Sequence, residues 1–83
     1  MKVTVRYFAS LRESLGCASE TLQTQAATVG ALRDELIARG GAYAQALARG
    51  RAVRAAVDQV MADEGAALRA DCEVAFFPPV TGG

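Results

Sequence analysis

The sequence predicts an α+β domain in which a mixed β-sheet packs across one main helix, with an extended C-terminal tail. Two strand-like stretches come before a helical stripe of apolar residues at 29–37, and shorter strand-like stretches follow it. This order is typical of a sheet wrapped around a single helix. Two prolines then separate the last stretch from the end of the chain. Because 83 residues suffice for one domain, we place that domain at residues 1–77 and the tail at residues 78–83.

Residues 2–8 alternate between apolar and polar side chains, which is the period of a half-buried strand. Successive side chains of a strand point to opposite faces of the sheet. We therefore expect Val3, Val5 and Tyr7 to face the core and Phe8 to face the other way.

A short helix and a second strand are expected next. Ser10 and Glu13 have the spacing of a capping box, with the Ser10 hydroxyl accepting from early helix amides, and Gly16 is suited to end the helix. Residues 19–25 are interpreted as a strand that is anchored mainly by Leu22.

The main helix is predicted from residue 29 onward, with Thr28 as its N-cap. The residues of its apolar stripe recur at helical spacing and are Val29, Leu32, Leu36 and Ile37. The pair Gly40-Gly41 is expected to end it, and residues 43–47 suggest one more short helix before Gly50.

Three further strands are expected near the C-terminus. Residues 53–57 and 60–62 are interpreted as two short strands around a turn at residues 58–59. Residues 66–68 predict a single turn that closes one end of the core. Residues 73–77 form the last strand, and its alternation turns Val74 and Phe76 inward and Phe77 outward.

The charges balance, with nine basic and nine acidic residues, so no overall field favours nucleic acid or a membrane. No apolar run approaches the roughly 18 residues that a membrane span needs, and no leader peptide is recognisable. We expect a soluble, cytoplasmic protein without nucleic-acid or membrane partners. Arg49, Arg51 and Arg54 form a small basic cluster. A solvated loop is the favoured interpretation of that cluster, and a docking site is the alternative.

The domain itself offers little for catalysis. Histidine, the usual metal ligand and the usual base near neutral pH, is absent, so we expect no metal site. The 83 residues contain no phosphate-binding G-x-x-x-x-G-K-[ST] loop, so we expect neither bound ATP nor enzymatic activity of the chain on its own. Cys17 and Cys72 do not form a Cys-x-x-Cys pair and are expected to be reduced thiols. A persulfide-carrying role for one of them is the alternative.

The tail is the stretch that points most directly to a function. Pro78 and Pro79 lack amide donors and fix φ near −65°, so we expect the chain to leave the last strand as an extended segment. Six residues at about 3.3 Å each reach roughly 20 Å, enough to enter the active site of another protein. Gly82 and Gly83 have no Cβ, so a narrow channel can close around them. The reactive group would then be the carboxylate of Gly83, and a frayed chain end is the alternative.

Three stretches carry a resemblance to a known family that covers the whole chain. Residues 76–83 (FFPPVTGG), 55–59 (AAVDQ) and 5–13 (VRYFASLRE) resemble the small, sulfur-carrier subunits of molybdopterin synthase. The resemblance implies a ubiquitin-like β-grasp fold. Two positions depart from the family pattern, because Asp58 stands where we expect Asn, and Asp71-Cys72 stands where we expect Gly-Asp.

The function that this resemblance implies is sulfur carriage for molybdenum cofactor biosynthesis. A ubiquitin-activating-type adenylyltransferase would consume ATP to adenylate Gly83, and a sulfur donor protein would help convert it to a thiocarboxylate. The large synthase subunit would receive the tail and use its sulfur for the dithiolene of molybdopterin. Gly82 would thread the channel of that partner, and Val80 and Thr81 would fill its mouth.

The resemblance also implies that the first and last strands lie side by side and parallel. Together with the alternation of side chains, this places Phe8 and Phe77 on the sheet face away from the helix, where Met61 would extend the patch. Exposed apolar patches mark interaction sites, and each buried Phe contributes on the order of 2 kcal/mol. We therefore expect Phe8, Met61 and Phe77 to form a partner-binding face. The alternative is that a bulge turns one Phe into the core.

Other functions stay open at this point. The same tail could serve thiamin synthesis or tRNA thiolation, or could conjugate the chain to other proteins as a ubiquitin-like modifier. A plain binding module with an idle tail is the third alternative. A gain of about 16 Da, as sulfur replaces oxygen at the C-terminus, is expected only of a sulfur carrier.

Overall fold

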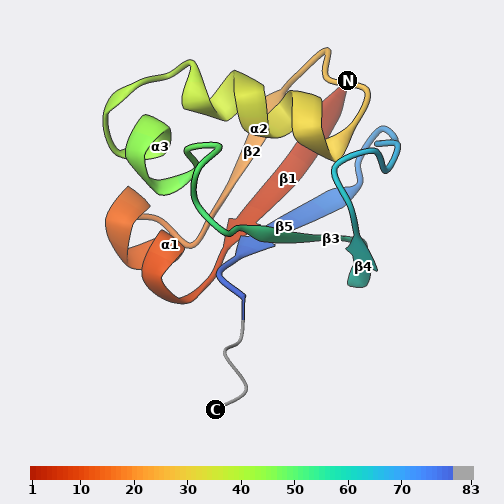
Figure 1. Ribbon diagram of the computed structural model, residues 1–83. Coiled ribbons are helices and arrows are strands. Elements are labelled where there is room, and N and C mark those ends of the chain that lie inside the picture. Colours follow the sequence, from red (N-terminus) through yellow and green to blue (C-terminus); the bar gives the residue numbers. More distant parts are fainter. Residues whose placement is uncertain (80–83) are drawn as a thin grey trace.

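The computed structural model describes residues 1–79, which form a five-stranded mixed sheet and three helices (Figure 1). In chain order the elements are β1 (Lys2–Tyr7), α1 (Ala9–Leu15), β2 (Ser19–Gln23), α2 (Val29–Ile37), α3 (Gly41–Ala46), β3 (Arg54–Val57), β4 (Val60–Ala62) and β5 (Glu73–Phe77). This is the α+β, β-grasp arrangement that the sequence predicts, with α2 as the main helix.

The sheet has the order β2-β1-β5-β3-β4, so the first and last strands are neighbours at its centre. β1 and β5 are parallel, with Val5 opposite Val74 and Tyr7 opposite Phe76. The other pairs of neighbouring strands are antiparallel. Parallel neighbours need a long crossover connection, which here includes α2, α3 and the β3–β4 hairpin. Since β1 and β5 are parallel, their C-terminal ends lie side by side, next to the start of the tail.

Helix α2 lies across one face of the sheet (Figure 1). Its N-cap is Thr28 as predicted, because the Thr28 hydroxyl accepts a hydrogen bond from the Ala31 N–H at 3.2 Å. The predicted stripe is buried except for Ile37, which is half-buried. The largest fully buried side chains pack between helix and sheet and are Tyr7, Phe76, Leu32, Leu36, Leu47, Val3, Val5, Val29 and Val74. This apolar layer is the core of the domain.

The β3–β4 hairpin turns at Asp58 and Gln59, whose φ angles of 49° and 69° are both positive. Positive φ at both central residues is the requirement of a two-residue type I′ hairpin turn. Asp58 also fixes the turn to β5, because its N–H donates to the Glu73 carbonyl at 2.8 Å and its Oδ1 accepts from the Glu73 N–H at 2.9 Å. Aspartate tolerates the left-handed region, so this departure from the family pattern is compatible with a tight turn.

The predicted capping box at Ser10 is wrong. Helix α1 begins at Ala9, its N-cap is Phe8, and no side chain caps it. The Leu11 N–H donates to the Phe8 carbonyl at 3.1 Å, so Ser10 already lies inside the helix. The helix begins directly where β1 ends, earlier than the capping spacing indicated. Gly16 ends it with a φ of 75°, as predicted.

Other boundaries also differ from the prediction. The single turn predicted at residues 66–68 is not formed, because Ala67 forms an antiparallel bridge with Thr28 and the Leu68 N–H donates to the Ala27 carbonyl at 2.9 Å. Leu68 is nevertheless buried in the core. Helix α2 ends before the glycine pair, and Gly41 is the first residue of α3. Strands β2 and β3 are slightly shorter than expected.

Within residues 1–79, no helix has the length and apolar character that a membrane crossing requires.

Candidate functional site

A groove lies on the sheet face opposite α2, near the end of β5, and we call it the docking groove. Its volume is about 720 Å³. Aromatic, proline and alanine side chains make up most of its lining, with a few polar residues at the margin: Arg6, Phe8, Ala9, Ala56, Gln59, Glu73, Ala75, Phe77, Pro78 and Pro79.

The alternation of β5 accounts for the floor of the groove. Val74 and Phe76 point into the core, at 0% and 1% exposure, and the residues between and after them point to the opposite face. Ala75 is paired with Arg6 on β1 and with Ala56 on β3. Directly paired residues share a face of the sheet. Two alanines therefore lie side by side in the floor, where larger side chains would fill the groove.

Phe8 and Phe77 stand at the borders of this floor. The Phe8 N–H donates to the Phe76 carbonyl at 3.2 Å, which continues the parallel pairing of β1 and β5 by one residue. Phe8 is 42% exposed and Phe77 is half-buried. The predicted placement of both rings on the face away from α2 is confirmed. Their role in partner binding stays a prediction.

Arg6 and Glu73 form the charged margin of the docking groove. The Arg6 guanidinium carbon lies 5.6 Å from the centroid of the Phe8 ring, within the range of a cation–π contact. Arg6 Nη1 lies 3.6 Å from Glu73 Oε1. Because both side chains are partly exposed, this ion pair contributes little to stability. The Arg6 guanidinium therefore lies within reach of both the Glu73 carboxylate and the Phe8 ring.

Met61 lies on the same face of the sheet but outside the docking groove. It pairs with Ala56, which places its side chain on the groove face, one strand further out. It is 61% exposed. The neighbouring Val60 is 68% exposed, so the edge strand β4 presents two apolar side chains. The predicted three-residue face therefore divides into a groove with two Phe residues and a separate methionine at the sheet edge.

The predicted tail is described only at its beginning. Strand β5 ends at Phe77, and Pro78 and Pro79 follow it without secondary structure and line the docking groove. Val80, Thr81, Gly82 and Gly83 lie outside the described residues. The last two described residues thus leave the domain at the groove.

A cluster of hydroxyl and carboxylate groups supports the end of β1 from the core side. Glu20 Oε2 accepts hydrogen bonds from the Tyr7 hydroxyl at 2.9 Å and the Tyr43 hydroxyl at 2.7 Å, and Glu20 Oε1 accepts from Arg39 at 2.8 Å. Burial, together with the Glu20 carboxylate, raises the pKa of Tyr7. Tyr7 therefore stays a neutral donor, fixed directly behind Phe8.

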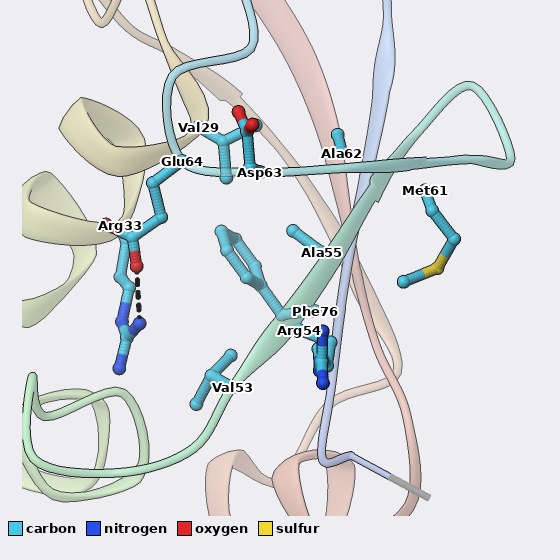
Figure 2. A pocket seen from close by; sticks show the side chains of 10 residues that line it. All are labelled: Val29, Arg33, Val53, Arg54, Ala55, Met61, Ala62, Asp63, Glu64 and Phe76. Atoms are coloured by element: carbon cyan, nitrogen blue, oxygen red, sulfur yellow. Dashed lines mark hydrogen bonds and ion pairs between the residues drawn. The ribbon is translucent and has the colours of Figure 1, made fainter.

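A second hollow of about 350 Å³ lies between α2 and the β3–β4 hairpin (Figure 2). Phe76, Val29 and Ala55 form its apolar wall, and Arg33 and Glu64 pair across its margin at 2.7 Å. Among residues 1–79, every buried side-chain nitrogen and oxygen has a hydrogen-bond partner. The hollow therefore presents no buried polar group aimed at a ligand.

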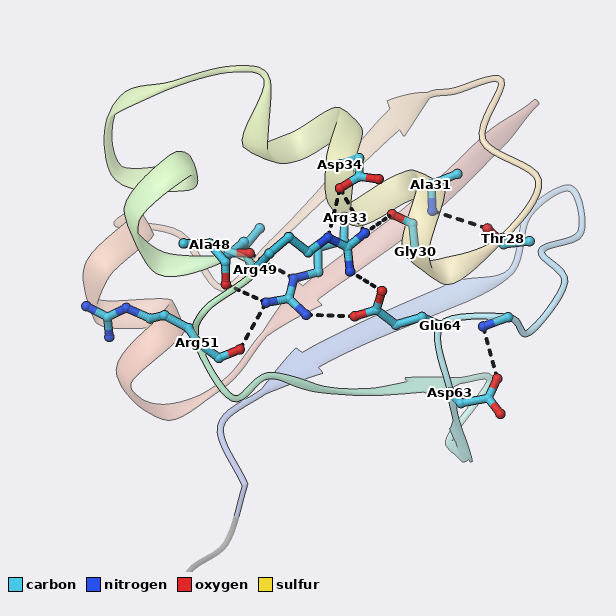
Figure 3. Close-up of polar contacts among 12 residues, drawn as sticks. Thr28, Gly30, Ala31, Arg33, Asp34, Ala48, Arg49, Arg51, Asp63 and Glu64 are labelled. Atoms are coloured by element: carbon cyan, nitrogen blue, oxygen red, sulfur yellow. Dashed lines mark hydrogen bonds and ion pairs between the residues drawn. The ribbon is translucent and has the colours of Figure 1, made fainter.

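Arg33 is a buried charged residue that the sequence reasoning missed (Figure 3). It is 4% exposed, and its Nε donates to the Leu47 carbonyl at 2.8 Å. Its Nη2 donates to the carbonyls of Ala48 at 2.7 Å and Arg51 at 3.1 Å, and its Nη1 pairs with Glu64. This network fastens the α3–β3 loop to α2. Its position in the sequence could have indicated this burial, because Arg33 follows the buried Val29 by four residues and lies on the same face of the helix.

Arg49, from the predicted basic cluster, is engaged within the chain (Figure 3). It pairs with Asp34 at 2.8 Å, donates to the Gly30 carbonyl at 2.9 Å, and contacts Glu64. Hydrogen bonds from Arg49, and then from Arg33, lower the pKa of Glu64 against the opposing effect of burial. Arg54 lies apart from this network, paired with Phe77 across β3 and β5.

The two cysteines lie outside the docking groove. Cys17 is half-buried, Cys72 is buried, and both are free thiols. Among residues 1–79, no group of three or more cysteine or acidic side chains is arranged to hold a metal ion.

Comparisons with known proteins agree with this geometry. The model of the ThiS family matches residues 5–83. The molybdopterin synthase sulfur carrier subunit of Haemophilus influenzae is 40% identical over 81 residues, covering 98% of this chain and 99% of that protein. SAMP1 of Haloferax volcanii, a small archaeal modifier protein, has a TM-score of 0.77 at 28% identity, covering all of both chains. A chain from the complex of subunits 1 and 2 of molybdopterin-converting factor from Helicobacter pylori has a TM-score of 0.69 at 23% identity, also covering all of both chains, and shows the fold alone.

Proposed function

This chain belongs to the ThiS family, and on that premise we propose that it is the sulfur carrier subunit of a molybdopterin synthase, acting in molybdenum cofactor biosynthesis. The near full-length identity to the Haemophilus influenzae carrier subunit is the observation that carries this proposal. The docking groove supports it, because a carrier without a catalytic centre must bind the proteins that act on it.

The proposed chemistry takes place at the carboxylate of Gly83. A carboxylate is a poor electrophile, so it must first be activated. A carboxylate oxygen attacks the α-phosphorus of ATP on an adenylyltransferase of the ubiquitin-activating type, and pyrophosphate leaves. Sulfur supplied by a donor protein at the oxidation level of HS⁻ then attacks the acyl carbon, and AMP leaves. The product is a terminal thiocarboxylate, whose soft sulfur is a nucleophile.

The described residues contribute docking and direction to this chemistry. Phe8 and Phe77 would be covered by the partner, and Pro78 and Pro79 would direct the remaining residues toward its active site. A proline has no amide hydrogen and a fixed φ, so this part of the chain cannot fold back by pairing in the sheet. In this proposal, the sulfur would reach the partner's active site without being enclosed by the domain.

The partner that receives the sulfur is, in this proposal, the large subunit of the synthase. The name of the Haemophilus influenzae relative supports it, because a subunit requires at least one other. The adenylyltransferase, the sulfur donor, the use of ATP outside the chain and a cytoplasmic location belong to the same proposal. The chain itself would act as a sulfur-donating subunit and not as an enzyme on its own.

Intact mass spectrometry tests the proposal directly. The full chain is incubated with the adenylyltransferase, ATP and a sulfur donor, and its mass is expected to rise by about 16 Da as sulfur replaces oxygen. A variant that lacks Gly83 is the control and should show neither this gain nor sulfur transfer to the large subunit. An unchanged mass of the full chain, or full sulfur transfer by the truncated variant, would refute the mechanism.

A ubiquitin-like protein modifier is the second candidate, and the structural similarity to SAMP1 is the observation that favours it. It predicts an isopeptide bond between Gly83 and lysines of other proteins. Proteomic detection, after trypsin digestion, of lysines that carry residues 70–83 of this chain, lost when Gly83 is deleted, would support it over the carrier function.

A further inference from the structure

Ala9 has a backbone conformation that alanine rarely adopts. Its φ is 53°, in the left-handed region, where the Cβ of an ordinary residue is crowded by its own backbone. Glycine adopts this φ without strain because it has no Cβ. The sequence therefore retains a methyl group at a position where glycine would be the less strained residue.

Burial of the Ala9 methyl group in the core does not offset this strain. Ala9 is exposed and does not belong to the buried core cluster. Helix α1 begins at Ala9 without a side-chain cap. The high helix propensity of alanine does not stabilise this position either, because that propensity applies to residues with helical φ and not to a φ of 53°.

The location of Ala9 indicates a role for its methyl group in binding. Ala9 lines the docking groove together with Phe8 and Pro78. It is also the residue that joins Phe8 to α1, so any freedom at Ala9 changes where the Phe8 ring lies. On the other side of Phe8, the Arg6 guanidinium lies against the ring. Phe8 is thus held between a cation–π contact and a restricted backbone.

We infer that Ala9 is a binding residue for the large synthase subunit. Its methyl group is buried against that partner in the complex, and its Cβ restricts the β1–α1 junction so that Phe8 is already oriented for docking. This inference rests on the proposed function, which supplies the partner. Strained backbone conformations of this kind are concentrated at binding and catalytic sites. Preorganised groups lose less conformational entropy when they bind.

Ala9→Gly tests the inference because it relieves the strain and removes only the methyl group. In the full chain without partner, the melting temperature is expected to rise by several degrees. The dissociation constant for the large subunit, measured by titration calorimetry, is expected to increase about fourfold, the effect of losing one buried methyl group. A gain in stability is thus coupled to a loss of affinity.

Asp71→Gly is the matched control. Asp71 is exposed and also has a positive φ, 65°, but it lies before β5, at the strand end opposite to Phe77, and it does not line the docking groove. This variant should also melt at a higher temperature, by a smaller amount because aspartate tolerates the left-handed region better. Its dissociation constant should equal that of the unmodified chain.

Two results for Ala9→Gly would overturn the inference: an unchanged or lower dissociation constant, or a lower melting temperature. Phe77→Asp, measured in the same titration, separates this failure from a failure of the proposed function. If Phe77→Asp weakens binding and Ala9→Gly does not, only the role of Ala9 is refuted. If neither variant weakens binding, the docking role of the groove in the proposed function is refuted as well.

Discussion

Phe76 and Phe77 are neighbours in β5 and lie in opposite environments. Phe76 is 1% exposed and packs in the core with Val74, whereas Phe77 is half-buried and lines the docking groove. The inner face of the sheet is covered by α2, and the floor of the outer face consists of small side chains bordered by aromatic rings. The buried face accounts for stability, and we propose that the outer face accounts for recognition, so substitutions on the two faces should separate the two properties.

The largest expected effect is on the inner face. Phe76→Ala should lower the free energy of unfolding by about 3–5 kcal/mol, because it removes a buried ring and leaves a cavity. The free energy of unfolding of a small domain is only about 5–15 kcal/mol, so the variant should be close to unfolding. Urea denaturation followed by circular dichroism measures the loss. A loss below about 1 kcal/mol would show that the inner face is not the source of stability.

The next effect is on the outer face and concerns binding. Phe77→Asp should weaken binding of the large subunit by about thirtyfold or more, since burying a Phe contributes about 2 kcal/mol and a buried carboxylate is costly. The free energy of unfolding should change by less than about 1 kcal/mol, because Phe77 lies outside the core. Titration calorimetry and urea denaturation measure the two quantities.

Thr21→Asp is the control for charge on the outer face. Thr21 pairs with Thr4 across β1 and β2, is exposed, and lies outside the docking groove. It should bind the large subunit as tightly as the unmodified chain. Equal weakening by both variants would mean that the groove has no special role.

The smallest effect concerns pH and the Glu20 cluster behind the groove. Burial alone would raise the pKa of Glu20, but hydrogen bonds from Arg39, Tyr43 and Tyr7 lower it below the usual 4.5. Because the folded-state pKa is the lower one, the stabilisation is fully present above pH 4.5 and is lost as the pH falls through the folded-state pKa. The melting-temperature difference between the unmodified chain and Glu20→Gln should therefore shrink as the pH falls from about 6 to about 3. Glu64 titrates in both proteins, so its effect cancels. A difference that does not vary with pH would contradict this assignment.

The sequence by itself determined the order of the elements, the N-cap at Thr28, the turn at residues 58–59 and the opposite directions of Phe76 and Phe77. These features follow from local rules, because the periods of strands and helices and the conformational limits of proline and glycine act over a few residues. The resemblance to sulfur carriers, which the family match confirms, had the same origin in short stretches of sequence.

Only the tertiary structure decided the features that depend on distant contacts. Arg33 is buried because carbonyl groups from the α3–β3 loop and the carboxylate of Glu64 surround it. The local sequence around Arg33 does not predict that this loop packs against it. The start of α1 at Ala9, with its positive φ, follows from the pairing of Phe8 with β5 and not from the Ser10 spacing. Met61 lies outside the groove because β4 is the sheet edge. Each of these outcomes is set by packing between elements, which the one-dimensional pattern does not contain.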